Sequence, residues 1–189
     1  MHCGGTRRWF LEGIAIGLIS DLYPMADNLQ HGELAQIGGL LSTLVSAQPS
    51  KLRINLNKNK HLDLTTHMLL IANMTLIGPH FQISSDVSFK DSHLDVFTFS
   101  DMSKINMFSY AVLSSRESLL ENADNKHYRA KYLKIVSDPP MAVLGDGVLL
   151  GQGPFSVRIH PRALAVMAGK ELTGQPALTR VEKPRSGTQ

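Results

Sequence analysis

The sequence has a single cysteine, Cys3, so a disulfide bond within this chain is excluded. It also lacks any run of about 20 apolar residues, the length that a helix needs to cross a bilayer. Its first residues do not contain the apolar stretch of a secretory signal peptide. These absences predict a cytoplasmic protein in a reducing compartment, with at most a peripheral association with a membrane surface.

Strong charge of one sign is absent as well. The 19 Lys and Arg residues exceed the 16 Asp and Glu residues only slightly, which gives a net charge of +3. A nucleic-acid-binding protein usually carries a dense basic stripe with interleaved aromatic residues, and aromatic residues make up only 6% of this chain. We therefore expect no nucleic-acid partner, whereas a phosphate group or an acidic membrane surface is compatible with the mild basic excess.

Two common kinds of site are also missing from the sequence. The glycine pairs Gly145-Asp-Gly147 and Gly4-Gly5 are too short for a phosphate loop, and neither precedes a predicted helix. A single cysteine and scattered histidines provide no zinc-ligand spacing. These residues are therefore not expected to cradle a nucleotide or to form a structural zinc centre.

Apolar residues, by contrast, are plentiful. They make up 43% of the 189 residues, which is enough for a hydrophobic core, and the length suits one domain. The apolar pattern fades near the end of the chain, where the residues are polar and basic. We expect one domain over residues 1–172 and a disordered tail over residues 173–189.

Alternation between polar and apolar residues dominates this domain. It is clearest in Lys51–Asn57 and His61–Thr66, which flank a short turn and predict a β-hairpin with one wet face. The other expected strands are 8–18, a buried central strand 67–75, 94–99, 130–136, 142–144, 148–150, 155–159 and 163–167.

Helical spacing predicts a helix over residues 33–47 and a second from Asp101 or Ser103 to about Leu120. A polar loop or frayed helix end is expected over residues 121–129. Together these elements indicate a mainly β (α+β) fold, most simply a β-sandwich or open barrel with two helices.

Two turns that contain aspartate are candidate sites. Asp146-Gly147 joins two apolar pairs and suits a type I′ hairpin turn, because both residue types tolerate positive φ. Asp86 and Asp91, together with loop carbonyls, offer the oxygen ligands that a hard cation prefers. Asp and Ser side chains that cap their own backbone explain the same segment without a metal ion. Local chemistry alone therefore leaves both turns without an assigned function.

Three motif blocks follow one another along the chain. The first is Phe10–Leu18, a glycine-containing strand, and the second comprises Ile71–Asn73, Gly78 and Ile83–Val96. The third is Val143–Met167. In this order the blocks resemble the C-terminal domain of the diacylglycerol-kinase-like lipid kinases, which include bacterial diacylglycerol and phosphatidylglycerol kinases and sphingosine kinases. The second block is similar to the family's Asn, Gly, Pro-x-Ala and Asp-Gly-x-Leu-Asp-Val pattern, and the third to its Asp-Gly-Glu, Pro and Val-x-Pro-x-Ala-Leu pattern.

The resemblance implies the β-sandwich of the C-terminal domain of NAD kinase and diacylglycerol-kinase-like enzymes. Such kinases also have an N-terminal domain that binds ATP through a Gly-Gly-Asp-Gly-Thr loop, and this loop is absent from the present sequence. The implied reaction is in-line phosphoryl transfer from ATP to a lipid hydroxyl, assisted by magnesium. We therefore expect a substrate-side domain that needs a nucleotide-binding domain, in cis or in trans, and that is inactive alone.

The sequence departs from the family pattern at the implied site residues. The glutamate of Asp-Gly-Glu, to which the family assigns proton acceptance, falls on Val148, which leaves Asp146 as the nearest carboxylate. The family's magnesium position maps to Asp91, with Ser88 and His93 as backbone carbonyl donors. Ser92 stands where the family has glycine.

Three functional readings stay open at this point. The chain is the substrate-side domain of a lipid kinase, acting on a lipid such as diacylglycerol at a peripheral membrane surface. Alternatively, it is a non-catalytic lipid- or partner-binding module, in which Val148 marks the loss of catalysis. The third reading is a structural β-domain without a ligand. An apolar face left by a missing domain would also favour a homo-oligomer.

Overall fold

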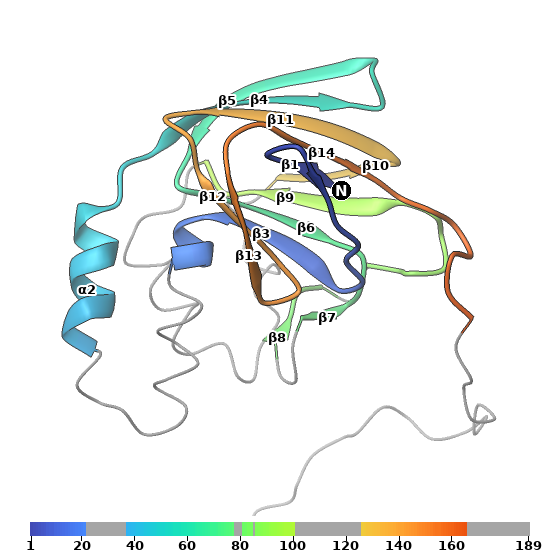
Figure 1. The fold of residues 1–189 in the computed structure, drawn as a ribbon, viewed down its shortest axis with the longest axis horizontal. Coiled ribbons are helices and arrows are strands. Elements are labelled where there is room, and N and C mark those ends of the chain that lie inside the picture. The colour runs from blue at the N-terminus through green and yellow to red at the C-terminus, as the bar shows by residue number, and fades with distance from the viewer. Residues whose placement is uncertain (22–36, 78–80, 85, 101–125, 166–189) are drawn as a thin grey trace, which may run out of the picture.

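A computed structural model describes residues 1–21, 37–77, 81–84, 86–100 and 126–165, and its strands form two facing six-stranded sheets (Figure 1). Neighbouring strands in both sheets pair antiparallel. Sheet 1 has the order β2 (Thr6–Arg7), β1 (His2–Cys3), β14 (Phe155–Arg158), β11 (Tyr132–Asp138), β4 (Ser50–Leu56) and β5 (Lys60–Thr66). Sheet 2 has the order β10 (Lys126–Ala130), β9 (Leu94–Thr98), β6 (Met68–Ala72), β3 (Gly13–Gly17), β12 (Ala142–Gly145) and β13 (Val148–Gln152).

Smaller elements complete the described part of the chain. Helix α2 (Ile37–Ser46) stands at the side of sheet 2, and β7 (Leu76–Ile77) pairs with β8 (Phe81–Gln82). Residues 18–21 are helical and follow β3 directly. Of the helices that the structure describes, none combines the length and the apolar character that crossing a membrane requires.

The main core lies between the two sheets. Alternate residues of each strand point inward, because successive side chains of a strand face opposite sides of the sheet. Sheet 2 contributes residues such as Ile14, Leu69 and Leu94, and sheet 1 contributes residues such as Ile54 and Leu133, all of them buried. The sandwich therefore follows from the period-two apolar pattern.

A second core covers the outer face of sheet 2. Leu70 and Phe97 point away from sheet 1 and pack with Leu44 of α2 and with Ile83 and Val87. Because both faces of sheet 2 are covered, every residue of β6 is buried. This explains why the sequence of β6 is a continuous apolar run, whereas the hairpin strands alternate.

Most of the predicted elements are confirmed. The mainly β sandwich, the hairpin of β4 and β5, the central strand β6 and the hairpin around Asp146-Gly147 all form. Strands β9, β11 and β14 lie at the positions predicted from alternation, and β3 is the core of the longer strand predicted over residues 8–18. Helix α2 falls within the predicted helix 33–47.

Two predictions were wrong. The segment predicted as a loop or frayed helix end contains β10, because Lys126–Ala130 pairs with the whole of β9. The expected strand 163–167 does not form over residues 163–165: the chain turns at Pro161 and Arg162, where Arg162 has a φ of 54°, and Leu164 is left 62% exposed. Whether a segment forms a strand depends on a pairing partner elsewhere in the chain, and local alternation does not show whether such a partner exists.

Two further predictions fall on residues outside the described part of the chain. These are the helix from Asp101 or Ser103 to Leu120 and the disordered tail over residues 173–189. Both stay predictions, as does the domain boundary at residue 172.

Candidate functional site

One end of sheet 2 brings together segments that are far apart in the sequence. The register pairs Gly13 with Ala72, Ala72 with Asp95, and Asp95 with Arg129. Asp146 continues the row on the other side, since its N–H donates to the carbonyl of Gly13 at 3.1 Å. We call this region the motif end of sheet 2, defined by Leu11–Gly13, Asn73, Ser88–Asp95, Arg129 and Asp146–Leu149.

The two candidate turns therefore lie at the same end of the sheet. Asp146 follows β12 and Asp91 precedes β9, and only β3 and β6 lie between those strands. Three strand spacings separate them, which corresponds to about 15 Å. Both turns therefore lie at one end of sheet 2, three strands apart.

Asp146 holds the entry to β3. Its Oδ2 accepts the N–H of Leu11 at 2.6 Å, and its Oδ1 accepts the N–H groups of Glu12 at 2.9 Å and Gly13 at 3.0 Å. The turn itself is built as predicted, since φ is 45° at Asp146 and 76° at Gly147. The carboxylate is therefore used as an acceptor for three backbone donors.

Asn73 holds the same segment from the other side. Its side-chain Nδ2 donates to the carbonyl of Leu11 at 2.7 Å, and its backbone N–H donates to the carbonyl of Glu12 at 2.9 Å. Residues 11–13 belong to the first motif block, Asn73 to the second and Asp146 to the third. Direct hydrogen bonds thus join all three blocks at the motif end.

The Asp91 turn is ordered by its own side chains. Asp91 Oδ1 accepts the N–H of His93 at 2.9 Å, and the carbonyl of Asp91 lies 2.8 Å from His93 Nδ1. Ser88 Oγ accepts the N–H of Lys90 at 3.3 Å. Within the described residues, no group of three or more His, Cys, Asp or Glu side chains is placed to hold a metal ion. That Ser88, Asp91 and His93 bind magnesium stays a prediction.

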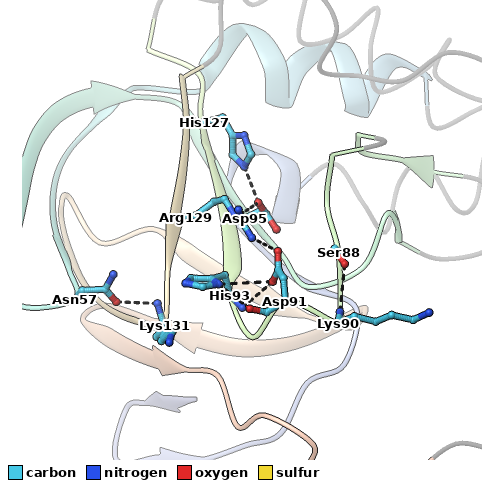
Figure 2. A network of polar contacts seen from close by, with 9 residues as sticks. All are labelled: Asn57, Ser88, Lys90, Asp91, His93, Asp95, His127, Arg129 and Lys131. Carbon is cyan, nitrogen blue, oxygen red and sulfur yellow. Dashed lines mark hydrogen bonds and ion pairs between the residues drawn. The ribbon is translucent and has the colours of Figure 1, made fainter.

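Strand β10 adds a charged network beside this turn (Figure 2). His127 Nε2 lies 2.7 Å from Asp95 Oδ1, and the His127 ring stacks on Phe97 with centroids 4.5 Å apart. The guanidinium of Arg129 pairs with Asp91 Oδ2 and lies 3.7 Å from Asp95 Oδ1. Four polar side chains are thus linked across β10, β9 and the turn that precedes β9.

Asp95 is the buried centre of this network. Its side chain is 0% exposed, and its Oδ2 has no hydrogen-bond partner. Burial raises the pKa of the Asp95 carboxyl, while the hydrogen bond and charge of His127 and the charge of Arg129 oppose the rise. The nearby positive charges therefore stabilise the ionised form of this buried carboxyl group.

His127 and Arg129 were missed as site residues by sequence reasoning. Both residues lie in the segment 121–129, which was predicted to be a loop or frayed helix end, although burial alternates along β10 in the structure. The polar residues at positions 127 and 129 and the apolar Tyr128 between them are the signal that could have indicated a strand.

Apolar side chains are exposed around the motif end. Val148 is 61% exposed and Leu149 is 65% exposed at the start of β13, and Leu11 and Phe89 are also exposed. Two surface hollows, of about 610 and 310 Å³, lie elsewhere: one lies along β4, β5 and β11, and the other reaches the far end of β9 at Thr98. The motif end is thus an exposed, partly apolar surface.

Comparison with known proteins gives a family match. A family model described as the YegS C-terminal NAD kinase beta sandwich-like domain matches residues 23–168. The chain is 27% identical over 180 residues to a protein of Staphylococcus haemolyticus (strain JCSC1435) named as a "putative lipid kinase". It is 26% identical over 178 residues to a protein of the same description from Staphylococcus aureus (strain JH9).

The two alignments cover 90% and 88% of this chain but 56% of each relative, so the chain spans about half the length of the curated relatives it matches. Solved structures agree with the fold. A structure titled as a "putative diacylglycerol kinase" from Bacillus anthracis str. Sterne superposes with a TM-score of 0.51 at 21% identity, over 79% of this chain and 51% of that one. Another of the same description and organism gives 0.50 at 19% identity, over 79% and 50%.

Proposed function

The chain belongs to the family of YegS C-terminal, NAD kinase β-sandwich-like domains, and from this premise we propose that it is the substrate-side domain of an ATP-dependent lipid kinase. The curated relatives named as lipid kinases support the reaction class. Because those relatives are about twice as long as the matched region, the proposal assigns to this chain one half of a phosphoryl-transfer site.

The observation that carries the proposal is the convergence of the three motif blocks at the motif end. Asp146 and Asn73 hold residues 11–13 through hydrogen bonds to the backbone, although the three segments lie 62 to 135 residues apart. A binding surface needs its residues to be held in place by supporting contacts, and these hydrogen bonds hold the three motif blocks together. We propose that this end faces a nucleotide-binding domain supplied in cis or in trans.

The proposed reaction forms a bond between the lipid hydroxyl oxygen and the γ-phosphorus of ATP. The bond from that phosphorus to the β,γ-bridging oxygen breaks, and the hydroxyl proton passes to a base. Val148 cannot accept this proton, and the Asp146 carboxylate already accepts three backbone N–H groups. We therefore assign the ATP site and the magnesium that accompanies ATP to the completing domain, and we infer that this chain lacks the family's base at position 148, so that transfer is slow.

The part proposed for this chain is to present the lipid. Leu11, Val148 and Leu149 are exposed beside the turns, where apolar side chains can contact acyl chains. Such a surface also suits a peripheral contact with a membrane or association with a second copy of the chain. Diacylglycerol is the proposed class of substrate, with a free hydroxyl as the phosphate acceptor.

A phosphoryl-transfer assay on the isolated chain tests the proposal. Purified protein is supplied with radiolabelled ATP, magnesium and diacylglycerol in mixed micelles, and lipid extracts are separated and counted. We expect no phospholipid product above a protein-free control, because the sequence lacks the Gly-Gly-Asp-Gly-Thr motif of the family's ATP loop. Robust turnover by the isolated chain would overturn the proposal.

A second function is a non-catalytic lipid- or partner-binding module. It is favoured by the valine at position 148 and by the use of Asp146 as an acceptor for backbone donors. Flotation with vesicles of neutral and anionic lipid tests binding without chemistry. Binding that persists while a form rejoined to a nucleotide-binding domain stays inactive, with or without Val148→Glu, would favour this function over the kinase.

A further inference from the structure

Arg129 lies between two carboxylates: Asp95, which belongs to β9, and Asp91, which lies in the turn before β9. Its guanidinium pairs with Asp91 Oδ2, and its Nε lies 3.7 Å from Asp95 Oδ1 (Figure 2). Strand register places Arg129 directly opposite Asp95, so its backbone position is set by the pairing of β10 with β9. The pairing of β10 with β9 therefore places Arg129 next to Asp95.

The oxygens of Asp91, the one side-chain ligand expected for a divalent cation at this turn, are already engaged. Asp91 uses Oδ1 for the N–H of His93 and Oδ2 for Arg129, and its carbonyl lies 2.8 Å from His93 Nδ1. Magnesium requires near-octahedral oxygen ligands at short distances. The arrangement of Asp91 fits a planar guanidinium better than such an ion.

The buried carboxylate of Asp95 is a second reason for a cation at this position, because a positive charge stabilises its ionised form. It is fully buried, and its other neighbour, His127, is charged only when protonated. Arg129 is charged at every accessible pH, and its forked donors can reach two carboxylates at once. One guanidinium can therefore pair with the carboxylate of the turn and lie beside the carboxylate of the strand.

We propose that Arg129 takes the place of a divalent cation in this chain, so that the turn before β9 is ordered by a guanidinium and needs no metal. The proposal concerns the order of this turn. Its test uses neither lipid nor ATP, so it can fail while the proposed kinase function stands.

Thermal unfolding of the full chain, with and without magnesium at matched ionic strength, provides the test. The unmodified protein should show the same Tm, within about 1 °C, in EDTA and in 10 mM MgCl₂, because a ligand stabilises only a state that binds it. Arg129→Gln should lower Tm in EDTA, and magnesium should then raise it by several degrees, since two carboxylates are left without their cation.

Two further variants serve as controls. Arg129→Lys keeps the charge and should lose part of the stability without gaining a response to magnesium. Arg53→Gln removes an arginine that pairs with Asp63 at 3.4 Å on an exposed surface, where the side chains are 73% and 76% exposed, so its Tm should hardly change.

Three results would overturn the proposal. A magnesium-stabilised unmodified protein would overturn the proposal, and so would an Arg129→Gln variant that behaves like Arg53→Gln or that shows no response to magnesium. If Arg129→Gln does not fold, the magnesium titration of the unmodified protein and of Arg129→Lys still decides: a rise in Tm of either by several degrees overturns the proposal, and no rise supports it.

Discussion

The two aspartate turns at the motif end differ in the partners that their carboxylates use. Asp146 accepts three uncharged backbone N–H groups of residues 11–13. Asp91 accepts one backbone N–H, from His93, and pairs with the charged guanidinium of Arg129. The first turn is thus held by neutral donors, and the second is held largely by charge.

This difference separates two ways of building one surface. Hydrogen bonds to fixed backbone groups set the position of the β3 entry and respond little to salt. An ion pair whose members are 48% and 24% exposed is screened by salt and can be matched by another cation. We therefore predict that the contribution of Asp146 to stability is independent of salt, whereas that of Asp91 falls as the salt concentration rises.

The largest expected effect comes from Asp146→Ala. The change removes the acceptor of three N–H groups, and we expect it to lower the free energy of unfolding by about 2–3 kcal/mol. Asp146→Asn keeps one carbonyl acceptor and the turn preference, so it should lose about half as much. Urea unfolding measures both values. A loss below about 1 kcal/mol for the alanine variant would show that the β3 entry does not depend on this carboxylate.

A smaller effect that depends on salt is expected for Asp91→Ala. The variant should lose about 1 kcal/mol at low ionic strength, and the loss should shrink in 1 M NaCl because the Arg129 pair is screened. The loss in Asp146→Ala should not shrink. Asp63→Ala, which removes an exposed partner of Arg53, is the matched control and should cost less. Equal salt dependence at both turns would remove the distinction between them.

Gly147→Ala sharpens the comparison from the backbone. Gly147 has a φ of 76°, a backbone conformation that a residue with a Cβ adopts only with strain, so we expect a loss of about 1 kcal/mol. Gly39→Ala in α2 has open space around the added methyl group and should instead stabilise by about 0.5–1 kcal/mol. Urea unfolding compares the two variants. A neutral Gly147→Ala would indicate that the turn relaxes into another conformation.

The smallest effect is expected for Val148→Glu. Val148 is 61% exposed, so the change should alter the free energy of unfolding by less than about 0.5 kcal/mol. The control is Leu149→Glu, which introduces the same charge at the neighbouring residue, where the side chain is 65% exposed. A loss well above that size would mean that Val148 packs against a partner in solution, and sedimentation would then report association.

The sequence predicts the architecture and one of the two turns well. Alternation identified the hairpin of β4 and β5, and Asp-Gly chemistry identified the turn at Asp146, because both depend on neighbours in the chain. The pairing of β10 with β9 depends on residues some 30 positions away, and the short alternation at residues 127–129 does not identify that partner. The network of His127 and Arg129 was lost with that strand.

The partners of Asp146 illustrate the same limit at the site itself. The turn type is local and was predicted, whereas the three N–H groups that the carboxylate binds lie 133 to 135 residues earlier. Only the fold shows that this carboxylate has a structural use. Likewise, Asn73 was noted within a motif block, but its hydrogen bond to Leu11 required the register of β3 and β6.

The most direct test fuses this chain to the part of the Staphylococcus haemolyticus relative that the chain does not span and measures phosphate transfer to diacylglycerol. The account predicts no product from the isolated chain, slow transfer from the fusion, and at least tenfold faster transfer from the fusion with Val148→Glu, since general bases contribute about 10²–10⁴-fold. Transfer by the isolated chain, or an inactive fusion with Val148→Glu that still folds, would contradict the claim that this domain is half of a lipid kinase site.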